Sequence, residues 1–389
     1  MLSNNFNLKL KKSIRKVCKN NNKIYLHEPI FTNDEKKLLN NCIKSTFVST
    51  SGKFVKDFEN KLSKFCKSKF ILATNSGTSA LHIAYIVANL GKKDEILVPA
   101  LNYIASANVA KYVGSTPHFI EVESDSFGID VKKLDKYLKK NTRKKGNYFY
   151  NKETDRKISA IVPTHLYGKI GNMNGIIKIA KKYNLILIED AAEAIGSYVN
   201  SKHAGTFGRM GILSFNGNKT ITTGSGGAIL FKYKSDYLKA KLIANVGKIN
   251  SNFKIIFKVL GYNYKMNNIQ AALGIAQLKK LKKILRFKKN LHEKYKKEFK
   301  NFTEFRLFEN NFSKSYNYWI NLIIFNDISK DKKNKIIKYL SNNNIETRSS
   351  WDLINSIEYF KNCPKMELTI SEKLYQKIIN LPSSPKYGQ

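Results

Sequence analysis

A polar segment at residues 74–79, Thr-Asn-Ser-Gly-Thr-Ser, offers the groups that bind a phosphate. Gly77 permits a tight turn, and Thr78 and Ser79 bring hydroxyl and backbone N–H groups to the start of the helix expected to follow. Backbone N–H groups at a helix N-terminus attract anions, so this segment predicts a phosphate site. An ordinary helix cap would use the same residues, and the segment alone does not separate the two interpretations.

A carboxylate ends one of the apolar runs of the chain. Asp190 follows the run LILIE and is followed by Ala191, Ala192 and Glu193. A carboxylate at the end of a buried strand is costly unless a cation or a strong donor meets it. A protonated pyridine nitrogen would be such a partner, and a helix N-cap is the alternative role for the same side chain.

Lys219 lies in a short polar connection, SFNGNK, between two apolar runs. A single lysine means little in a chain with 69 Lys and Arg residues, so the setting carries the argument. Ser214 precedes Lys219, and the glycine-rich turn TTGSGG at 222–227 follows it. Such a turn lets the backbone approach a bulky ligand closely.

A fourth segment, GYNYKM at 261–266, precedes a long helical stretch and suits either a site or an interface, or else a simple helix-entry turn. Taken together, the four segments supply a phosphate cup, an acid for a ring nitrogen and a lysine for a Schiff base. These three parts are the requirements of pyridoxal phosphate, so the sequence predicts a site for that cofactor and none for a metal.

The residues are positioned by an alternation of short apolar runs and helix-length segments. The runs lie at 70–74, 95–100, 117–122, 158–164, 185–190, 211–215 and 227–231. This alternation predicts an α/β fold with a mainly parallel sheet covered on both faces. The charged segment 141–157 has no period and is interpreted as a surface excursion.

The distribution of apolar and charged residues along the chain predicts three regions. Residues 1–23 are expected to form a basic helical arm, and residues 24–250 a large α/β domain that binds the cofactor. Residues 251–389 contain a long lysine-rich helical stretch at 270–300 and are expected to form a smaller α+β domain.

Composition excludes several classes of protein. The net charge of +40 comes mainly from lysines scattered through the chain, which favours a compositional bias over a nucleic-acid surface. No stretch approaches the roughly 20 apolar residues of a membrane span, so no membrane association is expected. The four cysteines, Cys18, Cys42, Cys66 and Cys363, lack the spacing of a zinc site and suit a reducing cytoplasm.

Ordered motifs over residues 24–385 resemble the DegT/DnrJ/StrS family of sugar aminotransferases. They include NSGTSALHIA, PTHLYGKIGNM, IEDAAEAIGS, SFNGNKTITTGSGGAIL, GYNYKMNNIQAALGIAQLKKL and LPSS. The resemblance implies the aspartate-aminotransferase fold, PLP-dependent transferase type I. LHEPIF and SFNGNK are most similar to the LegC-like branch, whose members act on UDP-linked 4-keto-6-deoxy N-acetylhexosamines on routes to bacillosamine and legionaminic-acid-type sugars.

The resemblance also implies roles for individual residues. Lys219 would form the imine with the cofactor, and Asp190 would meet the pyridine nitrogen. The other implied cofactor residues are Gly77, Thr78, Ser79 and Ser214 at the phosphate, Tyr103 stacked on the ring, Glu193 near the ring oxygen, and Asn263, which would reach the phosphate of a neighbouring subunit in a homodimer. His165, Tyr318 and Arg348 match positions near the substrate.

Three departures from the family pattern stand out. Glu193 replaces a Gln or His near the ring oxygen of the cofactor, so its carboxyl must be protonated, turned away or bound to the sugar. Lys265 replaces an Arg and keeps the charge without the fork geometry. The chain ends soon after LPSS, which puts the last helix of the smaller domain in doubt.

The sequence thus predicts a cytoplasmic aminotransferase that moves the amino group of glutamate to a UDP-N-acetyl-4-keto-6-deoxyhexosamine, for the synthesis of surface polysaccharide sugars. A related branch removes a sugar hydroxyl and carries His at the lysine position, so Lys219 favours transfer over dehydration. A non-catalytic regulator with the cofactor fold and a basic nucleic-acid binder are the further alternatives.

Overall fold

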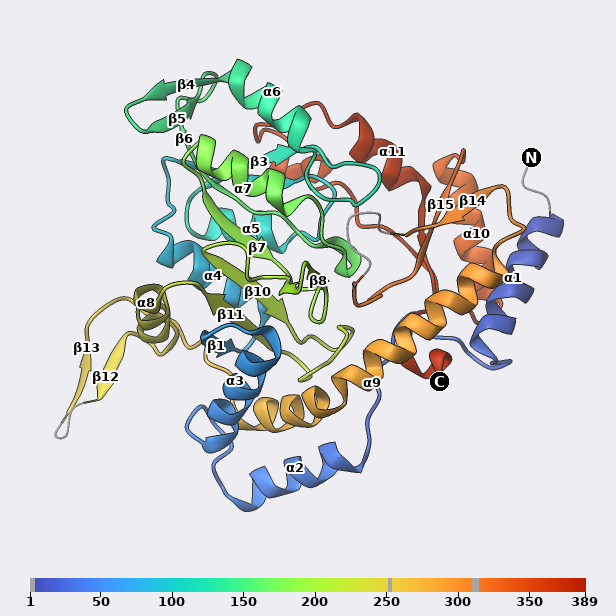
Figure 1. Ribbon diagram of the computed structural model, residues 1–389, viewed down its shortest axis with the longest axis horizontal. Helices are drawn as coiled ribbons and strands as arrows, with labels where there is room; N and C mark the ends of the chain where they lie inside the picture. Colours follow the sequence, from blue (N-terminus) through green and yellow to red (C-terminus); the bar gives the residue numbers. More distant parts are fainter. Residues whose placement is uncertain (1–3, 251–253, 310–314) are drawn as a thin grey trace.

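The computed structural model describes residues 4–250, 254–309 and 315–389. Its largest feature is a nine-stranded sheet with the strand order β1-β11-β10-β7-β6-β2-β3, extended by β5 and β4 beside β6 (Figure 1). β11 runs antiparallel to β1 and β10, and the five strands from β10 to β3 are parallel. The strands are β1 (Phe70–Thr74), β2 (Asp94–Pro99), β3 (Thr116–Ile120), β4 (Thr142–Lys145), β5 (Tyr148–Asn151), β6 (Lys157–Ile161), β7 (Ile186–Asp190), β10 (Met210–Ser214) and β11 (Gly227–Phe231).

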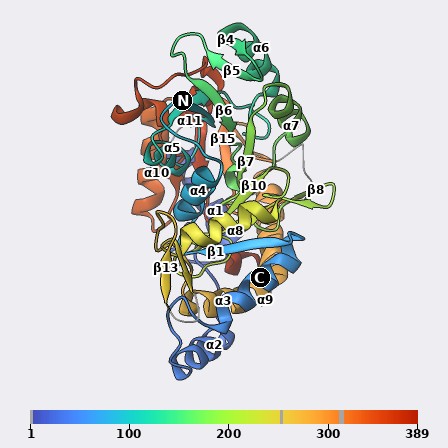
Figure 2. The same ribbon diagram turned by 90° about the vertical axis from the view of Figure 1, so that its left-hand side faces the viewer.

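Both faces of this sheet are buried. Alternate residues of one strand point to opposite faces, so Leu213 and Leu230 join one hydrophobic core while Ile212 and Ile229 join the other. Figure 2 shows α4 and α5 on one side of the strands and α7 on the other. Strands with two buried faces are continuously apolar, which is why the sequence marked them so clearly. The expected fold class, a mainly parallel α/β sheet of the type I transferases, is confirmed.

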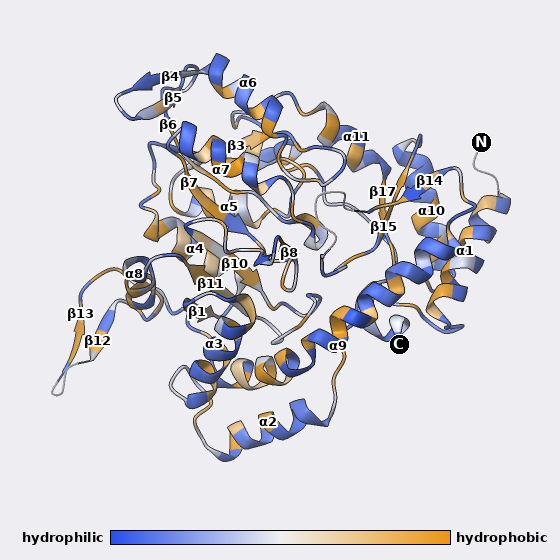
Figure 3. Cartoon of the chain, viewed as in Figure 1, coloured by the Kyte–Doolittle hydropathy of each residue, from blue (hydrophilic) through white to orange (hydrophobic). Residues whose placement is uncertain are grey.

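The helices around the sheet follow the same logic. α4 is almost wholly buried because it packs between the sheet, α5 and α8, whereas α3, α6 and α7 bury one face each. In Figure 3 the central strands are mostly hydrophobic and the outer helices carry hydrophilic faces. The helices of this part are α2 (Asn33–Lys44), α3 (Lys53–Cys66), α4 (Gly77–Val87), α5 (Ala105–Tyr112), α6 (Val131–Asn141), α7 (Met173–Lys182) and α8 (Lys234–Ala244), with a 3₁₀ turn, η1 (Leu166–Gly168).

A second, antiparallel sheet has the order β14-β15-β17-β16 and carries its own core. Its elements are α1 (Asn4–Cys18), β14 (Phe305–Leu307), β15 (Leu322–Phe325), α10 (Lys330–Asn342), β16 (Arg348–Ser349), α11 (Thr369–Lys377) and β17 (Ile378–Asn380), with a short 3₁₀ turn η4 (Pro385–Gly388). The 3₁₀ turns η2 (Ile354–Ser356) and η3 (Glu358–Phe360) follow β16 and pack in a core of the large sheet. Helix α11 precedes the LPSS motif, and the 3₁₀ turn η4 follows it. Phe6 of α1 lies in the same core as the strands of this sheet.

The 31-residue helix α9 (Asn268–Glu298) extends from the large sheet to the small one (Figure 1). Its start is fixed by a capping box, in which the Asn267 side chain accepts the N–H of Gln270 and the Gln270 side chain accepts the N–H of Asn267. Leu281 and Ile284 pack in a core of the large sheet, and Leu291 and Tyr295 pack in the core of the small one.

Three short hairpins complete the described structure. They are β4–β5, β8–β9 (Tyr198–Val199 and Lys202–His203) and β12–β13 (Lys248–Asn250 and Ile255–Phe257). The first falls in the segment expected to be an irregular surface excursion. Its strands have only four residues each; β4 is mostly charged and exposed, and β5 is too short to show a clear alternation in the sequence. Within the described ranges, no helix is both long and apolar enough to cross a membrane.

Candidate functional site

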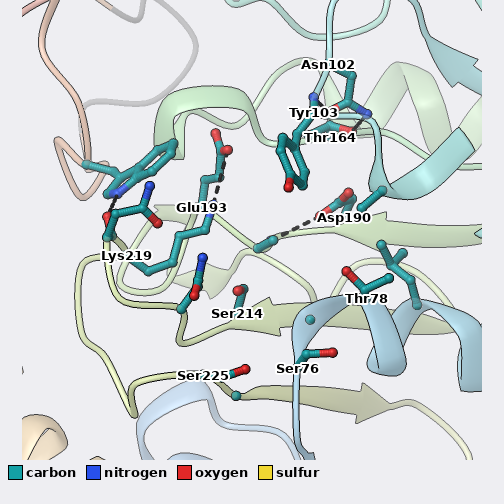
Figure 4. Close-up of a pocket in the computed structure, with 18 of the residues that line it drawn as sticks. Ser76, Thr78, Asn102, Tyr103, Thr164, Asp190, Glu193, Ser214, Lys219 and Ser225 are labelled. Atoms are coloured by element: carbon teal, nitrogen blue, oxygen red, sulfur yellow. Dashed lines mark hydrogen bonds and ion pairs between the residues drawn. The ribbon is translucent and has the colours of Figure 1, made fainter. Parts of the chain in front are cut away.

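A cavity of about 270 Å³ lies at the edge of the large sheet where the parallel strands end (Figure 4). The carboxyl ends of parallel strands meet at one edge of a sheet, which is where α/β proteins place their ligands. Asp190 and Ser214 are the last residues of β7 and β10. The cavity is lined by Ser76, Gly77, Thr78, Leu81, Asn102, Tyr103, Ala105, Thr164, Asp190, Ala192, Glu193, Ser214, Asn216, Asn218, Lys219, Ser225, Gly226, Trp319 and Trp351.

One end of the cavity is a cup of hydroxyl groups at the N-terminus of α4. Figure 4 shows Ser76, Thr78, Ser214 and Ser225 together on that side. Ser76 caps the helix by accepting the N–H of Ser79 at 3.0 Å. At Gly77 an added Cβ would lie 3.0 Å from Ser214 Cβ, so a side chain there would require Ser214 to shift by a few tenths of an ångström. Hydroxyls and a helix N-terminus form an anion site, and this cup fits a phosphate group.

Asp190 presents a buried carboxylate to the same cavity. Its Oδ2 accepts the Ser106 hydroxyl at 2.7 Å, and its Oδ1 accepts the N–H of Ala192 at 3.2 Å. These two donors fix the orientation of the carboxylate, and a carboxylate has lone pairs for further donors. A buried carboxylate that faces a cavity fits a protonated ring nitrogen, which would supply the missing positive charge.

Lys219 approaches from the turn after β10, where its N–H donates to Asn216 O at 3.0 Å. Its Nζ lies 3.3 Å from Glu193 Oε1 and 4.1 Å from the centre of the Trp319 ring. Trp319 is held in turn by its indole N–H, which donates to Asn218 O at 2.7 Å. The aromatic face and the carboxylate together hold the lysine amine at the cavity that Asp190 and the hydroxyl cup also line.

The structure gives Glu193 a definite orientation. Oε1 faces Lys219, and Oε2 accepts the N–H of Tyr167 at 2.7 Å. Burial raises the pKa of the Glu193 carboxyl above its ordinary value, while the charge of Lys219 and the Tyr167 N–H act in the opposite direction. Glu193 therefore faces Lys219 and the turn η1 at the cavity, and its relation to the cofactor oxygen stays a prediction.

The hydroxyl cup, the carboxylate and the amine form a donor set that fits pyridoxal 5′-phosphate. They come from three separate stretches of the chain and converge on one cavity, as Figure 4 shows. The cup would hold the phosphate, Asp190 the ring nitrogen and Lys219 the aldehyde carbon. Tyr103 also lines the cavity, and its half-exposed ring is available to cover the bound ring.

Five residues expected in the site lie outside the cavity lining. These residues are Ser79, His165, Asn263, Tyr318 and Arg348. The Ser79 hydroxyl lies 2.8 Å from that of Ser76, beneath the cup. The Asn263 side chain is exposed, and its backbone O accepts the Asn75 side chain at 3.2 Å; its role at a phosphate stays a prediction.

Of the other three residues, His165 and Tyr318 have side-chain partners within the fold. Buried His165 Nε2 lies 2.8 Å from Glu189 Oε2. Tyr318 packs against His292 with ring centroids 4.8 Å apart, and Arg348 is exposed on the edge strand β16. Their assignment to the substrate stays a prediction from the resemblance.

Lys265, the other departure from the family pattern, donates its ammonium to Thr50 O at 3.3 Å. Burial lowers its pKa below the ordinary value. Its contact is with a backbone carbonyl, for which a fork geometry is not needed.

Sequence reasoning missed two tryptophans and a polar pair. Trp319 and Trp351 both line the cavity, and the Asn102 side chain donates to Thr164 Oγ1 at 2.7 Å beside Asp190. The tryptophans come from the second sheet, more than 90 residues after Lys219, so no local pattern links them to it. One available signal was their rarity, because the chain contains only two.

Comparison with known proteins gives a consistent result. Residues 29–389 match the DegT/DnrJ/EryC1/StrS aminotransferase family. The chain is 31% identical to a GDP-perosamine synthase of Vibrio cholerae over 363 residues, 93% of this chain and 94% of that protein. It is 36% identical over 253 residues to a UDP-4-amino-4,6-dideoxy-N-acetyl-beta-L-altrosamine transaminase of Campylobacter jejuni, 65% of this chain and 63% of the other.

A solved structure shares the fold over nearly the whole chain. Helicobacter pylori PseC, an aminotransferase involved in the biosynthesis of pseudoaminic acid, aligns with a TM-score of 0.83 and 25% identity. The alignment covers 92% of this chain and 93% of that one.

Proposed function

The chain belongs to the DegT/DnrJ/EryC1/StrS aminotransferase family and is a pyridoxal phosphate-dependent sugar aminotransferase of nucleotide-sugar biosynthesis, and on this premise we propose its substrates and the roles of its residues. It transfers the amino group of glutamate to the keto carbon of a nucleotide-linked 4-keto-6-deoxy sugar. The preferred acceptor is a UDP-linked N-acetyl-4-keto-6-deoxyhexosamine, and the product enters the synthesis of a surface polysaccharide or a bacillosamine- or legionaminic-acid-type sugar.

The observation that carries this proposal is the convergence of Lys219, Asp190 and the hydroxyl cup on one cavity. When bound, pyridoxal phosphate supplies an electron-accepting ring that stabilises a carbanion next to the substrate nitrogen. Asp190 keeps a proton on the ring nitrogen. The freed Lys219 amine moves a proton between the substrate carbon and the C4′ carbon of the cofactor, first for glutamate and then, in reverse, for the keto-sugar.

Lys219→Ala provides the test of this assignment. The variant should lose all glutamate-dependent formation of 2-oxoglutarate and the borohydride-reducible link to the cofactor. Asp190→Ala should bind the cofactor weakly and turn over far more slowly. Turnover at the wild-type rate in a folded Lys219→Ala variant would remove this lysine from the mechanism.

A GDP-linked 4-keto-6-deoxyhexose is the second candidate acceptor, because the Vibrio cholerae relative that matches over 93% of the chain is a GDP-perosamine synthase. The sequence LHEPIF and the Campylobacter jejuni relative support the UDP-linked acceptor instead. The two are separated by kcat/KM for both keto-sugars with glutamate in excess, followed by identification of the aminated product. The proposal requires the higher value for the UDP-linked sugar.

We also propose that the active enzyme is a homodimer, in which Asn263 of one subunit reaches the phosphate cup of the other. Large apolar side chains are exposed near this residue, among them Phe257 at 67% and Leu260 at 84%. Exposed apolar patches of this kind are typical of interfaces. Leu260→Asp should shift the protein toward a monomer in analytical ultracentrifugation and lower its affinity for the cofactor, and a dimer of unchanged stability would contradict this interface.

The compartment that we propose is the cytoplasm. All four cysteines are buried as free thiols, which suits a reducing environment. Retention of full activity in strong reducing agent is expected, and dependence of activity on a disulfide would contradict it.

A further inference from the structure

The two tryptophans of the chain flank one tyrosine beside the cavity. The Tyr167 ring is nearly parallel to Trp351, with centroids 5.4 Å apart at 18°, and to Trp319, with centroids 6.5 Å apart at 24°. Both tryptophans line the cavity, and Tyr167 itself is fully buried between them. The three rings form one wall, which we call the aromatic wall.

The two tryptophans differ in what they contact. Trp319 carries the Lys219 amine 4.1 Å from its ring centre, so its cavity face is already in use. Trp351 has Tyr103 against its edge, with centroids 6.1 Å apart at 68°. In the part of the chain that the structure describes, no cation and no hydrogen-bond acceptor pairs with the indole of Trp351. Its role in the site is therefore open.

The support behind Trp351 is rigid and strained. Tyr167 has a φ of +56°, a conformation that is rare for a bulky residue, and its N–H donates a hydrogen bond to Glu193 Oε2 at 2.7 Å. Strain of this kind persists where the surrounding structure enforces it, and it gathers at functional sites. The stacked Tyr167 ring fixes the position of Trp351, which is the requirement for a surface that orients a ligand.

From these contacts, and resting on the proposed function, we propose that Trp351 binds the apolar face of the sugar ring of the nucleotide-sugar substrate and distinguishes 6-deoxy sugars from sugars with a C6 hydroxyl. One face of a hexopyranose carries C–H groups, and a 6-deoxy sugar adds a methyl group. An aromatic face gains dispersion contacts from these groups and removes them from water. A C6 hydroxyl placed there would lose its hydrogen bonds to water.

The size of the cavity favours the sugar over the nucleobase as the occupant of this wall. At about 270 Å³ the cavity is at the lower end of small-ligand sites, which span roughly 300–1,000 Å³. The base is separated from the reacting sugar carbon by a diphosphate and a ribose, so it must lie outside the cavity that Trp351 lines.

The test compares Trp351→Ala and Trp351→Phe with the wild-type holoenzyme. In Trp351→Ala the KM for the UDP-linked 4-keto-6-deoxy sugar should rise roughly 10- to 100-fold. The rate at which glutamate changes the cofactor absorbance should stay within about 2-fold, because glutamate has no sugar ring. Trp351→Phe should recover most of the loss. Tyr359→Ala removes an aromatic ring that is 71% exposed and lies outside the cavity, so it should leave both values unchanged.

Binding measurements separate the possible outcomes. Free UDP should bind wild type and Trp351→Ala equally in calorimetry, whereas the UDP-sugar should bind the variant more weakly, and the preference of the wild type for a 6-deoxy over a 6-hydroxy sugar should shrink. An unchanged affinity for the UDP-sugar overturns the proposal. An equal loss for free UDP also overturns it, because the wall would then hold the base.

Fluorescence gives a readout that does not depend on catalysis. In Trp319→Phe all tryptophan emission comes from Trp351, since the chain has two tryptophans. The UDP-sugar should change this emission and glutamate should not, and no change at saturating UDP-sugar would contradict the contact. If wild type fails to react with glutamate, the aminotransfer proposal fails, but these binding measurements still decide the role of Trp351.

Discussion

Glu193 and Lys219 form an ion pair that cofactor binding must disturb. Lys219 Nζ lies 3.3 Å from Glu193 Oε1, and only 4% of Glu193 is exposed. The lysine amine must turn to the aldehyde carbon to bond the cofactor, and the phenolic oxygen of the cofactor would then lie near a carboxylate. Both effects oppose binding, so Glu193→Gln should bind pyridoxal phosphate more tightly than wild type while the Gln side chain still accepts the Tyr167 N–H.

The magnitude follows from the geometry. Two unit charges 3.3 Å apart attract by about 5 kcal/mol at an effective dielectric constant of 20. Desolvation offsets a large part of this attraction, because charges buried in protein lose their hydration. We expect a net difference of roughly 1.5–3 kcal/mol, which corresponds to a dissociation constant about 10- to 150-fold lower in the variant.

The pH dependence gives this prediction its signature. Burial raises the pKa of Glu193, so the carboxyl becomes neutral as the pH falls through that raised value and then resembles Gln. The difference between variant and wild type should be largest at alkaline pH and should shrink toward acidic pH. Cofactor titration of the apo-protein, followed by absorbance across the pH range in which the protein stays folded, measures it.

A matched control is Glu123→Gln, because burial also raises the pKa of Glu123, which bonds Ser126 outside the cavity. This variant should leave cofactor affinity unchanged at every pH. The reasoning is refuted if folded Glu193→Gln binds the cofactor no more tightly than wild type. It is also refuted if the two differ by the same factor at both ends of the pH range.

Three further predictions concern stability. Burial raises the pKa of Glu59 from 4.5 to about 7, so its contribution to stability is lost as the pH rises through that interval. The free energy of unfolding of Glu59→Gln, taken relative to wild type, should therefore be higher at pH 8 than at pH 5. Urea unfolding should show an increase of at most roughly 3 kcal/mol. At Gly211 an added Cβ would lie 2.0 Å from Gly205 O, so Gly211→Ala should lower the free energy of unfolding by about 3 kcal/mol or more, measured by thermal unfolding. Gly217→Ala is the control: the nearest atom is 3.8 Å away, and the loss should be about 1 kcal/mol or less. The buried Asn317 side chain forms hydrogen bonds with three backbone groups, those of Glu193, Ile195 and Trp319. Asn317→Ala should lower the free energy of unfolding by about 3 kcal/mol, and a loss below about 1 kcal/mol would mean that water replaces these hydrogen bonds.

The large sheet was readable in the sequence because its strands are buried on both faces. The run at 227–231, for example, sends Leu230 into one core and Ile229 into the other, and every residue of β11 is buried. The hairpin at 142–151 was not predicted, because both of its strands have only four residues and β4 is mostly charged. The alternation of apolar and polar residues indicates a half-buried strand, and a strand of four residues is too short to show it clearly.

The candidate site was readable for a related reason. Asp190 and Ser214 stand at the ends of apolar runs, and parallel strands bring such ends to one edge. Trp319 and Trp351 could not be placed in this way, because packing of the second sheet against the first brings them to the cavity. The orientation of Glu193 depends on the N–H of Tyr167 and on Lys219, and no spacing in the sequence encodes it.

Helix α9 has 31 residues, and at 1.5 Å per residue it is about 46 Å long. Its first half is part of a core of the large sheet, and its second half is part of the core of the small one. Neither core can lose this helix without breaking the other. The described parts should therefore melt together, and calorimetry should record one endotherm in which the calorimetric and van't Hoff enthalpies agree.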